Sequence, residues 1–215
     1  MAEGSRPFYD RFLKKAPQQG RSRSVVESVL AAAAEGIDRT GSEEEIRLQD
    51  VAERAGVGVG SLYDYFRDRK NLMAAFAAKI TEDNLRSFEA VLERTHDMDL
   101  RAGIEAIVDH ALETYGHRKR LARVALRVAV QIGLMPALAH NQNVFAERLE
   151  AALRKRTDLG TRDPKLSAWV LTHGLMGVVN TLLWDDAPPL ADAEIRRAFV
   201  DMAVDHLSAT GDKRP

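Results

Sequence analysis

Hydroxyl and basic side chains gather between residues 59 and 70 of the sequence. They are Ser61, Tyr63, Tyr65, Arg67, Arg69 and Lys70. Hydroxyl, guanidinium and ammonium groups donate the hydrogen bonds that proteins make to DNA phosphates. Tyrosines that face outward would contribute little to a hydrophobic core. The pattern therefore predicts a surface that contacts phosphates and base edges.

The elements that would hold these side chains are two short helices joined by a turn. In the first helix, apolar residues recur at three- and four-residue spacing on one face: Leu48, Val51, Ala52 and Ala55. Gly56 then ends the helix, because glycine adopts a positive φ without a Cβ clash. In the second helix, Leu62 and Phe66 form an inward pair four residues apart. This succession is typical of a helix-turn-helix DNA-binding motif.

The same residues carry a family resemblance. The A-G-V-S-x-G-x-L-Y-x-Y-F-x-x-K-x-x-L signature of TetR-type (tetracycline-repressor family) transcription regulators is similar to Gly56-Val57, Leu62-Tyr63, Tyr65-Phe66, Arg69 and Leu72. The match covers about the N-terminal third of the chain. It departs at Gly58, where the family usually has serine, and at Arg47, where it has threonine or serine. Glycine is an acceptable helix N-cap, and Arg47 would replace a hydroxyl contact to phosphate with a charged one.

The resemblance implies an all-α fold with an N-terminal three-helix helix-turn-helix DNA-binding domain. A larger C-terminal helical domain would bind a ligand and dimerise. It also implies a transcriptional regulator, most often a repressor, that binds a quasi-palindromic double-stranded DNA operator as a homodimer. A small-molecule effector would release the operator. Activation instead of repression stays open.

The composition fits a soluble, cytoplasmic protein. Hydrophobic residues make up 45% of the 215 positions, which is enough for a core. The absence of cysteine excludes disulfides, thiolate nucleophiles and cysteine-based zinc sites. The N-terminal residues lack the apolar region of an export signal, and no stretch approaches about 18 uncharged apolar residues. No membrane partner is expected.

The net charge of -1 conceals a basic N-terminus. Residues 1–23 hold six basic residues against two acidic ones. Residues 1–21 are predicted to form a basic, flexible arm before the first helix. Such an arm could lie along DNA or enter a minor groove. A solvated tail without a DNA contact is the equally weighted alternative.

Helical periodicity divides the rest of the chain. A first helix over residues 22–39 completes a DNA-binding domain over 22–68, and a long helix over 69–95 links it to the remainder. Residues 69–215 are predicted to form the effector-binding and dimerisation domain. Its further helical patterns cover residues 100–116, 118–134, 137–157, 163–184 and 190–209. No strand alternation is present, so the prediction is all-α.

The predicted DNA-binding residues follow from the resemblance and from their outward positions. They are Arg47, Val59, Gly60, Ser61, Tyr63, Asp64, Tyr65 and Arg69. The two tyrosines and Arg69 stand where the family contacts phosphates. Val59 could meet a thymine methyl group, and Asp64 could accept a hydrogen bond from a cytosine amino group. An ion pair with Arg67 is the alternative role for Asp64.

Polar and aromatic residues inside apolar helical stripes are the candidates for an effector pocket, because buried polar atoms need partners. They are His110, Tyr115, Arg123, Arg127, Gln131, Asn141, Phe145, His173 and Asn180. Ordinary core or interface roles are the alternative for the histidines and Asn180, and a solvated face or a domain contact is the alternative for the arginines. An inward arginine would favour a carboxylate-bearing effector. Without one, a largely apolar or aromatic effector fits better.

The helix predicted over residues 163–184 is apolar on nearly every side and must be covered on more than one side. With the following helix it could form a four-helix bundle with the same pair from a second chain. The candidate interface residues are Gly174, Gly177, Trp184, Phe199, Met202 and His206. An internal core helix pair within a monomer is the alternative.

Catalysis is not expected. Di-metal helical bundles use paired Glu-x-x-His motifs, and this chain has the single motif Glu93-x-x-His96. The sequence also lacks a nucleophile elbow, a P-loop and a dinucleotide fingerprint. We therefore expect no metal, no cofactor and no enzymatic activity. The alternatives to a regulator are a helical interaction or sensor protein without DNA binding and, with less support, a helical-bundle enzyme.

Overall fold

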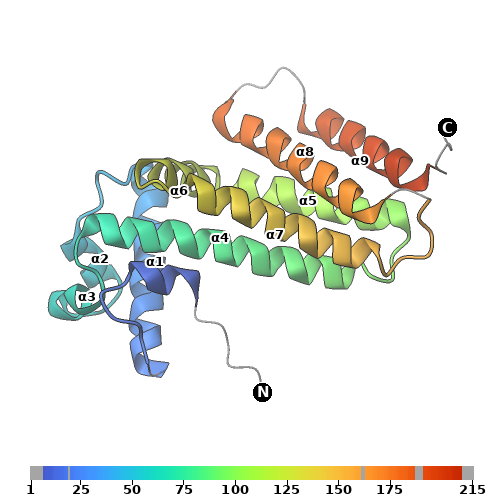
Figure 1. Ribbon diagram of the computed structural model, residues 1–215. Helices are drawn as coiled ribbons and strands as arrows, with labels where there is room; N and C mark the ends of the chain where they lie inside the picture. The colour runs from blue at the N-terminus through green and yellow to red at the C-terminus, as the bar shows by residue number, and fades with distance from the viewer. Residues whose placement is uncertain (1–6, 19, 161–162, 187–190, 210–215) are drawn as a thin grey trace. The chain divides into compact units, whose positions relative to one another are not determined.

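The computed structural model describes residues 7–18, 20–160, 163–186 and 191–209, and every regular element within them is a helix (Figure 1). The predicted all-α fold is confirmed. The chain divides into two compact units. Unit 1 comprises Met1–Asp83 and Arg118–Met135, and unit 2 comprises Asn84–His117 and Pro136–Pro215.

Unit 1 is built around the helix-turn-helix motif. Its elements are the 3-10 helix η1 (Phe8–Phe12), α1 (Gly20–Thr40), α2 (Leu48–Arg54), α3 (Val59–Tyr65), the first part of α4 (Arg69–Arg94) and α6 (Lys119–Gln131). Its core includes Val26, Ile37, Leu62, Phe66 and Phe76, all essentially inaccessible to solvent. The inward pair Leu62 and Phe66 therefore orients α3, as its spacing predicts.

Two turns of unit 1 depend on glycine. Gly41 follows α1 with a φ of 73°, and Gly56 joins α2 to α3 with a φ of 67°. Both values lie in the left-handed region, which residues with a Cβ avoid. Gly58 is the N-cap of α3 with extended backbone, and no side chain caps that helix. The predicted glycine N-cap is thus present.

Unit 2 contains the end of α4 and four further helices. They are α5 (Leu100–His117), α7 (Met135–Leu153) from residue 136 onward, α8 (Pro164–Trp184) and α9 (Asp192–Ser208). Asp163 caps α8 by accepting from the Lys165 backbone N–H (2.9 Å), and Pro164 occupies the first turn. The core includes Val91, Val108 and Val200.

The helix boundaries follow the predicted pattern with two clear differences. The helix predicted over 118–134 ends at Gln131, and the helix predicted over 137–157 begins at Met135 and ends at Leu153. Gly133 has a φ of 76°, and the Leu134 N–H donates to the Ala129 carbonyl oxygen (2.8 Å). A left-handed glycine of this kind ends a helix by satisfying its last carbonyl groups.

Helix α6 belongs to unit 1, although the domain prediction ended the DNA-binding domain at residue 68. Arg120 donates from Nη1 to the Asp38 carbonyl oxygen (3.1 Å), and Arg127 pairs with Glu43. Leu121, Val124 and other apolar residues of α6 join the core of unit 1. The two units are defined by packing and not by function. The end of the DNA-binding domain at residue 68 therefore stays a prediction.

Among the described helices, α8 is long and apolar enough to cross a membrane, judged by length and composition alone. The core helix of a soluble protein meets the same criterion. Leu171, Leu175, Val179 and Leu183 are buried on one side of α8. This side of α8 forms part of the core of unit 2. The opposite side is not covered by that core.

Candidate DNA-binding and effector sites

Helix α3 presents a polar and exposed face. Val59 and Tyr63 are each 39% exposed, and Gly60, Ser61 and Asp64 are exposed as well. Leu62, between them, is completely buried. This arrangement arises because Leu62 and Phe66 bind α3 to the core and turn Tyr63 and Asp64 outward. The predicted contact residues Val59, Gly60, Ser61, Tyr63 and Asp64 are thus accessible on α3, whereas Tyr65 is partly buried and packs against the core of unit 1.

The two predicted arginine contacts, Arg47 and Arg69, also lie in unit 1. Arg47 is exposed and is the N-cap of α2. Arg69 begins α4, and its Nη1 donates to the Glu44 carbonyl oxygen (2.6 Å) while the residue stays exposed. This bond fixes the Arg69 side chain against the loop before α2. A guanidinium has five N–H donors, so Arg69 retains donors for a phosphate.

Asp64 forms an ion pair, but with a partner that the sequence reading did not consider. Its Oδ2 lies 3.5 Å from Nζ of Lys15, and both side chains are more than half exposed. The local spacing predicts Arg67, three positions after Asp64, as the alternative partner, whereas Lys15 lies 49 positions before Asp64 in the sequence. The tertiary fold, rather than local spacing, therefore supplies the partner.

The described part of the predicted N-terminal arm is folded, which differs from the expected flexible arm. Tyr9 is 1% exposed and belongs to the core of unit 1, and Phe8, Phe12 and Leu13 pack against that core. The sequence signal was the apolar content of residues 8–13, which the count of basic residues obscured. Residues 1–6 and 19 of the predicted arm lie outside the described residues.

Unit 2 contains an apolar cavity between its helices. Its lining residues come from α4, α5, α7, α8 and α9: Asn84, Phe88, Ile104, Ile107, Val108, His110, Ala111, Thr114, Tyr115, Phe145, Leu149, Leu171, Thr172, Leu175, Met176, Phe199 and Ala203. Its empty volume, including the part open to solvent, is about 680 Å³. A concave site lined mainly by apolar and aromatic side chains is the usual form of a small-molecule binding site.

A short polar strip crosses this apolar lining. Nε2 of His110 lies 3.1 Å from the Ser87 hydroxyl and 3.5 Å from the Thr114 hydroxyl. The Asn84 amide nitrogen lies 3.5 Å from the Tyr115 hydroxyl, a weak hydrogen bond. The Thr172 hydroxyl is buried and has no partner among the described residues. Because these polar atoms contribute very little of the accessible surface of the cavity, a ligand would meet an almost entirely apolar wall.

Burial sets the charge state of the polar strip. It lowers the pKa of His110, and the positive charge of Arg94 lowers it further, against a smaller opposite effect of Glu113. Burial also raises the pKa of the Tyr115 hydroxyl, against the hydrogen bond from Asn84. His110 and Tyr115 are therefore both neutral near pH 7, so the strip offers hydrogen bonds without a formal charge.

The cavity brings together three of the nine predicted effector residues, namely His110, Tyr115 and Phe145. Three others, Arg123, Arg127 and Gln131, lie on α6 in unit 1 and do not line it. Asn141, His173 and Asn180 lie in unit 2 outside the lining. No predicted arginine points into the cavity. Sequence reading missed Asn84 and Thr172, which helical periodicity does not distinguish from ordinary core positions.

His173 has a different neighbourhood from the predicted one. Its ring stacks on that of Trp169 with centroids 4.2 Å apart, and its Nδ1 donates to the Trp169 carbonyl oxygen (2.8 Å). Both residues lie on the outward side of α8, where Trp169 is 51% exposed. His173 therefore belongs to an outer surface and not to the cavity.

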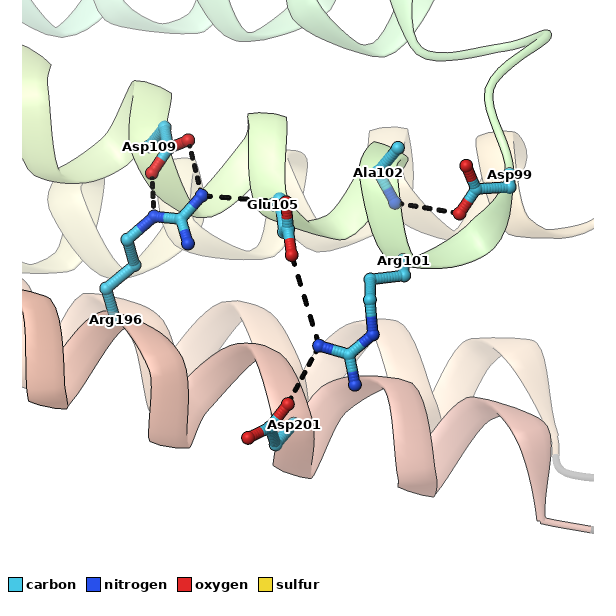
Figure 2. Close-up of polar contacts among 7 residues, drawn as sticks. All are labelled: Asp99, Arg101, Ala102, Glu105, Asp109, Arg196 and Asp201. Carbon is cyan, nitrogen blue, oxygen red and sulfur yellow. Dashed lines mark hydrogen bonds and ion pairs between the residues drawn. The ribbon is translucent and has the colours of Figure 1, made fainter.

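A charged network holds α5 and α9 together, as Figure 2 shows. Arg196 donates from Nε and Nη2 to both carboxylate oxygens of Asp109, with an Nη2–Oδ2 distance of 2.8 Å. Arg101 donates from Nη1 to Asp201 (2.8 Å), and Glu105 lies between the two arginines. The hydrogen bond from Arg196 lowers the pKa of Asp109. The network fixes two helices that supply walls of the cavity.

The outer face of α8 and α9 is apolar and exposed. Its large side chains are Leu166, Trp169, Val170, Trp184 and Met202. A Cβ added at Gly177 would meet no atom within 4 Å, so this predicted interface glycine is also on an open surface. Exposed apolar patches on soluble proteins mark surfaces that interact with proteins, membranes or ligands.

Two predicted interface residues, Phe199 and His206, make contacts within unit 2. Phe199 is buried, lines the cavity and lies 3.6 Å from the position of a Cβ at Gly174. His206 is partly buried, and its Nε2 lies 2.9 Å from the Ser167 hydroxyl. These residues join α8 to α9 within unit 2. Leu166, Trp169 and Val170, which the sequence did not single out as interface residues, are exposed on α8.

Two family models match the sequence, and the C-terminal one includes helix α6, which packs in unit 1. Residues 29–76 match the family model described as bacterial regulatory proteins, tetR family. Residues 99–207 match the model described as tetracyclin repressor-like, C-terminal domain. No curated protein matches the sequence.

Several solved structures share the fold at low sequence identity. A TetR-family transcriptional regulator from Mesorhizobium loti MAFF303099 is 17% identical with a TM-score of 0.72, covering 89% of this chain and 100% of its own. A TetR-family regulator from Rhodococcus sp. is 21% identical with a TM-score of 0.62, covering 87% and 100%. SmeT, the repressor of the Stenotrophomonas maltophilia multidrug efflux pump SmeDEF, is 21% identical with a TM-score of 0.58, covering 88% and 97%.

The C-terminal family model spans just over half of the 215 residues, and the N-terminal model spans the helix-turn-helix motif that places α3 at the surface. The chain therefore belongs to the TetR family of bacterial regulatory proteins and is a DNA-binding transcriptional regulator.

Proposed function

We propose that this regulator binds a quasi-palindromic operator as a homodimer and releases it when a largely apolar small molecule occupies the cavity of unit 2. The observation that carries the proposal is the exposed face of α3, where Ser61, Tyr63 and Asp64 are accessible while Leu62 is buried. A recognition helix needs this arrangement to enter a major groove.

Contacts to the operator divide into two kinds. Tyr63, Tyr65, Arg69 and Arg47 are proposed to bind phosphates, with Ser61 beside them. Val59, Gly60 and Asp64 are proposed to approach base edges, where a good contact discriminates by about 1–3 kcal/mol. The small residues at the start of α3 offer few hydrogen bonds to bases. Part of the sequence preference would therefore come from DNA shape.

The effector is proposed to be an uncharged, largely aromatic or aliphatic molecule with one or two polar groups. The cavity lining supports this because it is apolar apart from a few residues such as His110, Thr172 and Tyr115. The arginines that would have favoured a carboxylate lie on α6 in unit 1. SmeT, whose fold is similar, represses a multidrug efflux pump. That role is compatible with an effector of the proposed class.

Homodimerisation is proposed to occur through the outer face of α8 and α9. Two copies would pair these helices as a four-helix bundle, which covers Trp169, Trp184 and Met202. The same two-fold axis would place two recognition helices in successive major grooves, about 34 to 36 Å apart or somewhat more.

Helices α4 and α6 connect the two units, so a structural change at the cavity could alter the position of α3. Helix α4 begins in unit 1 and ends in unit 2, where Asn84 and Phe88 line the cavity. Helix α6 packs in unit 1 but is joined at both ends to helices of unit 2. A ligand that favours another arrangement of α4 and α5 would shift the population toward a state that no longer fits the operator. A coupling of about 1–3 kcal/mol changes affinity about 5- to 150-fold.

The proposal is tested by selecting duplexes from a random-sequence pool with the full-length protein. A quasi-palindromic consensus whose binding weakens steeply with salt is expected. Equal binding to every duplex, or no binding at low salt, would overturn the proposed function. A set of apolar aromatic compounds is then screened by thermal shift, and those that stabilise the protein are expected to release the selected duplex.

A further inference from the structure

The N-terminal segment, residues 7–18, is anchored to unit 1 by a buried polar cluster. Arg23 on α1 donates from Nη1 and Nη2 to the two carboxylate oxygens of Asp10 (2.9 and 3.2 Å). Its Nη1 also lies 3.2 Å from the Tyr9 hydroxyl. Asp10 and Tyr9 are buried, so the paired guanidinium compensates for the loss of water around both. These bonds fix η1 on α1.

Directly after this anchor, the segment reaches the C-terminal end of the recognition helix α3. The Lys14 backbone N–H donates to the Tyr65 carbonyl oxygen (2.8 Å). Nζ of Lys14 donates to the Tyr63 carbonyl oxygen (2.9 Å). The last carbonyl groups of a helix have no partner within the helix. Lys14 satisfies two of them, and its positive charge lies at the end of the helix dipole that favours cations.

Lys15 lies on the exposed side of the same helix end. Its Nζ is 3.5 Å from Oδ2 of Asp64 and 5.0 Å from the centroid of the Tyr65 ring. The Lys15 and Asp64 side chains remain 55% and 61% exposed, so the pair keeps access to a partner molecule. Asp64 carries a negative charge on the face that would meet DNA phosphates. Lys15 offsets that charge.

We propose that Lys14 and Lys15 belong to the DNA-recognition surface. Lys14 is a positioning residue that holds the C-terminal turn of α3, and Lys15 contacts an operator phosphate while it offsets the charge of Asp64. This inference rests on the proposed function of α3 as the recognition helix. The sequence predicted a flexible basic arm, whereas this inference assigns the DNA contact to two lysines that are held against α3 by specific contacts.

The phosphate role of Lys15 is tested with a duplex selected by the unmodified protein. Lys15→Ala is expected to weaken binding to selected and unrelated duplexes alike, and to lower the slope of log affinity against log salt by about one unit for each bound recognition helix. Lys155→Ala, at an exposed position in unit 2, is the control with the same charge change and should leave the slope unchanged.

A double-mutant cycle separates phosphate contact from simple pairing with Asp64. In an Asp64→Asn background, Lys15→Ala should still reduce the salt slope if Lys15 binds a phosphate. If the effect of Lys15→Ala disappears in that background, the lysine acts only on Asp64 and the phosphate contact is overturned. Failure to select any duplex would overturn the proposed function together with this inference, whereas unchanged binding by Lys15→Ala overturns this inference alone.

The positioning role of Lys14 is tested by Lys14→Met, which retains the backbone hydrogen bond and removes the ammonium. The ratio of affinities for selected and unrelated duplexes is expected to fall several-fold, and Lys14→Arg should restore much of it. Hydrogen exchange gives a readout without DNA, because the Phe66 amide, which donates to the Leu62 carbonyl oxygen at the end of α3, should exchange faster in Lys14→Met. Unchanged exchange and an unchanged affinity ratio would overturn the role.

Discussion

Nη1 of Arg127 on α6 lies 3.1 Å from Oε2 of Glu43, a buried carboxylate in the loop between α1 and α2. The Oε1 atom of Glu43 has no partner among the described residues. Arg127 is therefore the charge partner that the structure provides for this carboxylate. The ion pair ties α6 to the loop that leads into the helix-turn-helix motif, within unit 1.

Arg127→Ala should destabilise the protein by about 1–3 kcal/mol, because it leaves a buried carboxylate without its partner. Urea unfolding measures this loss. Arg154→Ala breaks an exposed i, i+4 pair with Glu150 and serves as the control, with an expected loss below about 1 kcal/mol. In the Glu43→Gln background the effect of Arg127→Ala should shrink. Equal losses for Arg127→Ala and Arg154→Ala would show that the pair has no special role.

The helix-turn-helix motif was predictable from sequence because its signals are local. Leu62 and Phe66 lie four residues apart, and Gly56 marks the turn between α2 and α3. The position of α6 was not predictable in this way. Its apolar stripe predicts that one face is buried, but the same stripe would fit a core in either unit.

Side chains that depend on tertiary packing account for the differences at the candidate sites. Phe199 and Trp169 are both large apolar residues on adjacent helices, yet Phe199 is buried against α8 and Trp169 is exposed. Helix α8 is apolar on nearly every side, so its sequence contains no contrast that reveals which face is inward. Lys14 and Lys15 likewise contact residues about 50 positions later in the chain, which no local pattern encodes.

Thr172→Val should leave the ligand-free protein as stable as before or stabilise it by about 1 kcal/mol. The reason is that the buried Thr172 hydroxyl has no partner among the described residues, and valine has nearly the same shape. Thr181→Val is the matched control on the same helix, because the Thr181 hydroxyl donates to the Gly177 carbonyl oxygen (3.0 Å). Thermal unfolding compares the two variants. A clear destabilisation by Thr172→Val would mean that the hydroxyl has a partner.

The lowered pKa of His110 predicts a pH-dependent stability near neutrality. Burial favours the neutral ring in the folded protein, so the unfolded chain binds more protons between the folded pKa of His110 and its ordinary value of 6.5. Stability should therefore fall as pH decreases through this interval. His110→Gln should remove this part of the pH dependence. Melting curves from pH 8 to pH 5 measure it, and identical pH profiles for the two proteins would contradict the prediction.

The Asp109–Arg196 pair predicts a second loss of stability at lower pH. The hydrogen bond from Arg196 lowers the pKa of Asp109, so the pair contributes its full stability above the ordinary aspartate value of 3.8 and loses it as pH falls through the folded pKa. The carboxylate is partly exposed, so the contribution is small. Asp109→Asn should unfold with a weaker dependence on pH below 4. If Asp109→Asn loses as much stability at low pH as the unmodified protein, other carboxylates cause that loss.

Trp169→Arg should dissociate the proposed homodimer without unfolding the protomer. Trp169 is 51% exposed and lies on the outer face of α8, so an arginine there is solvated in a monomer but buried in a two-fold bundle. Sedimentation measures the mass, and circular dichroism measures the helix content. Met98→Arg, at an exposed apolar residue between α4 and α5, is the control and should remain dimeric. Because a monomer engages one half-site, Trp169→Arg should also bind a selected duplex far more weakly than the Met98→Arg control. A dimer that survives Trp169→Arg would move the interface away from this face of α8.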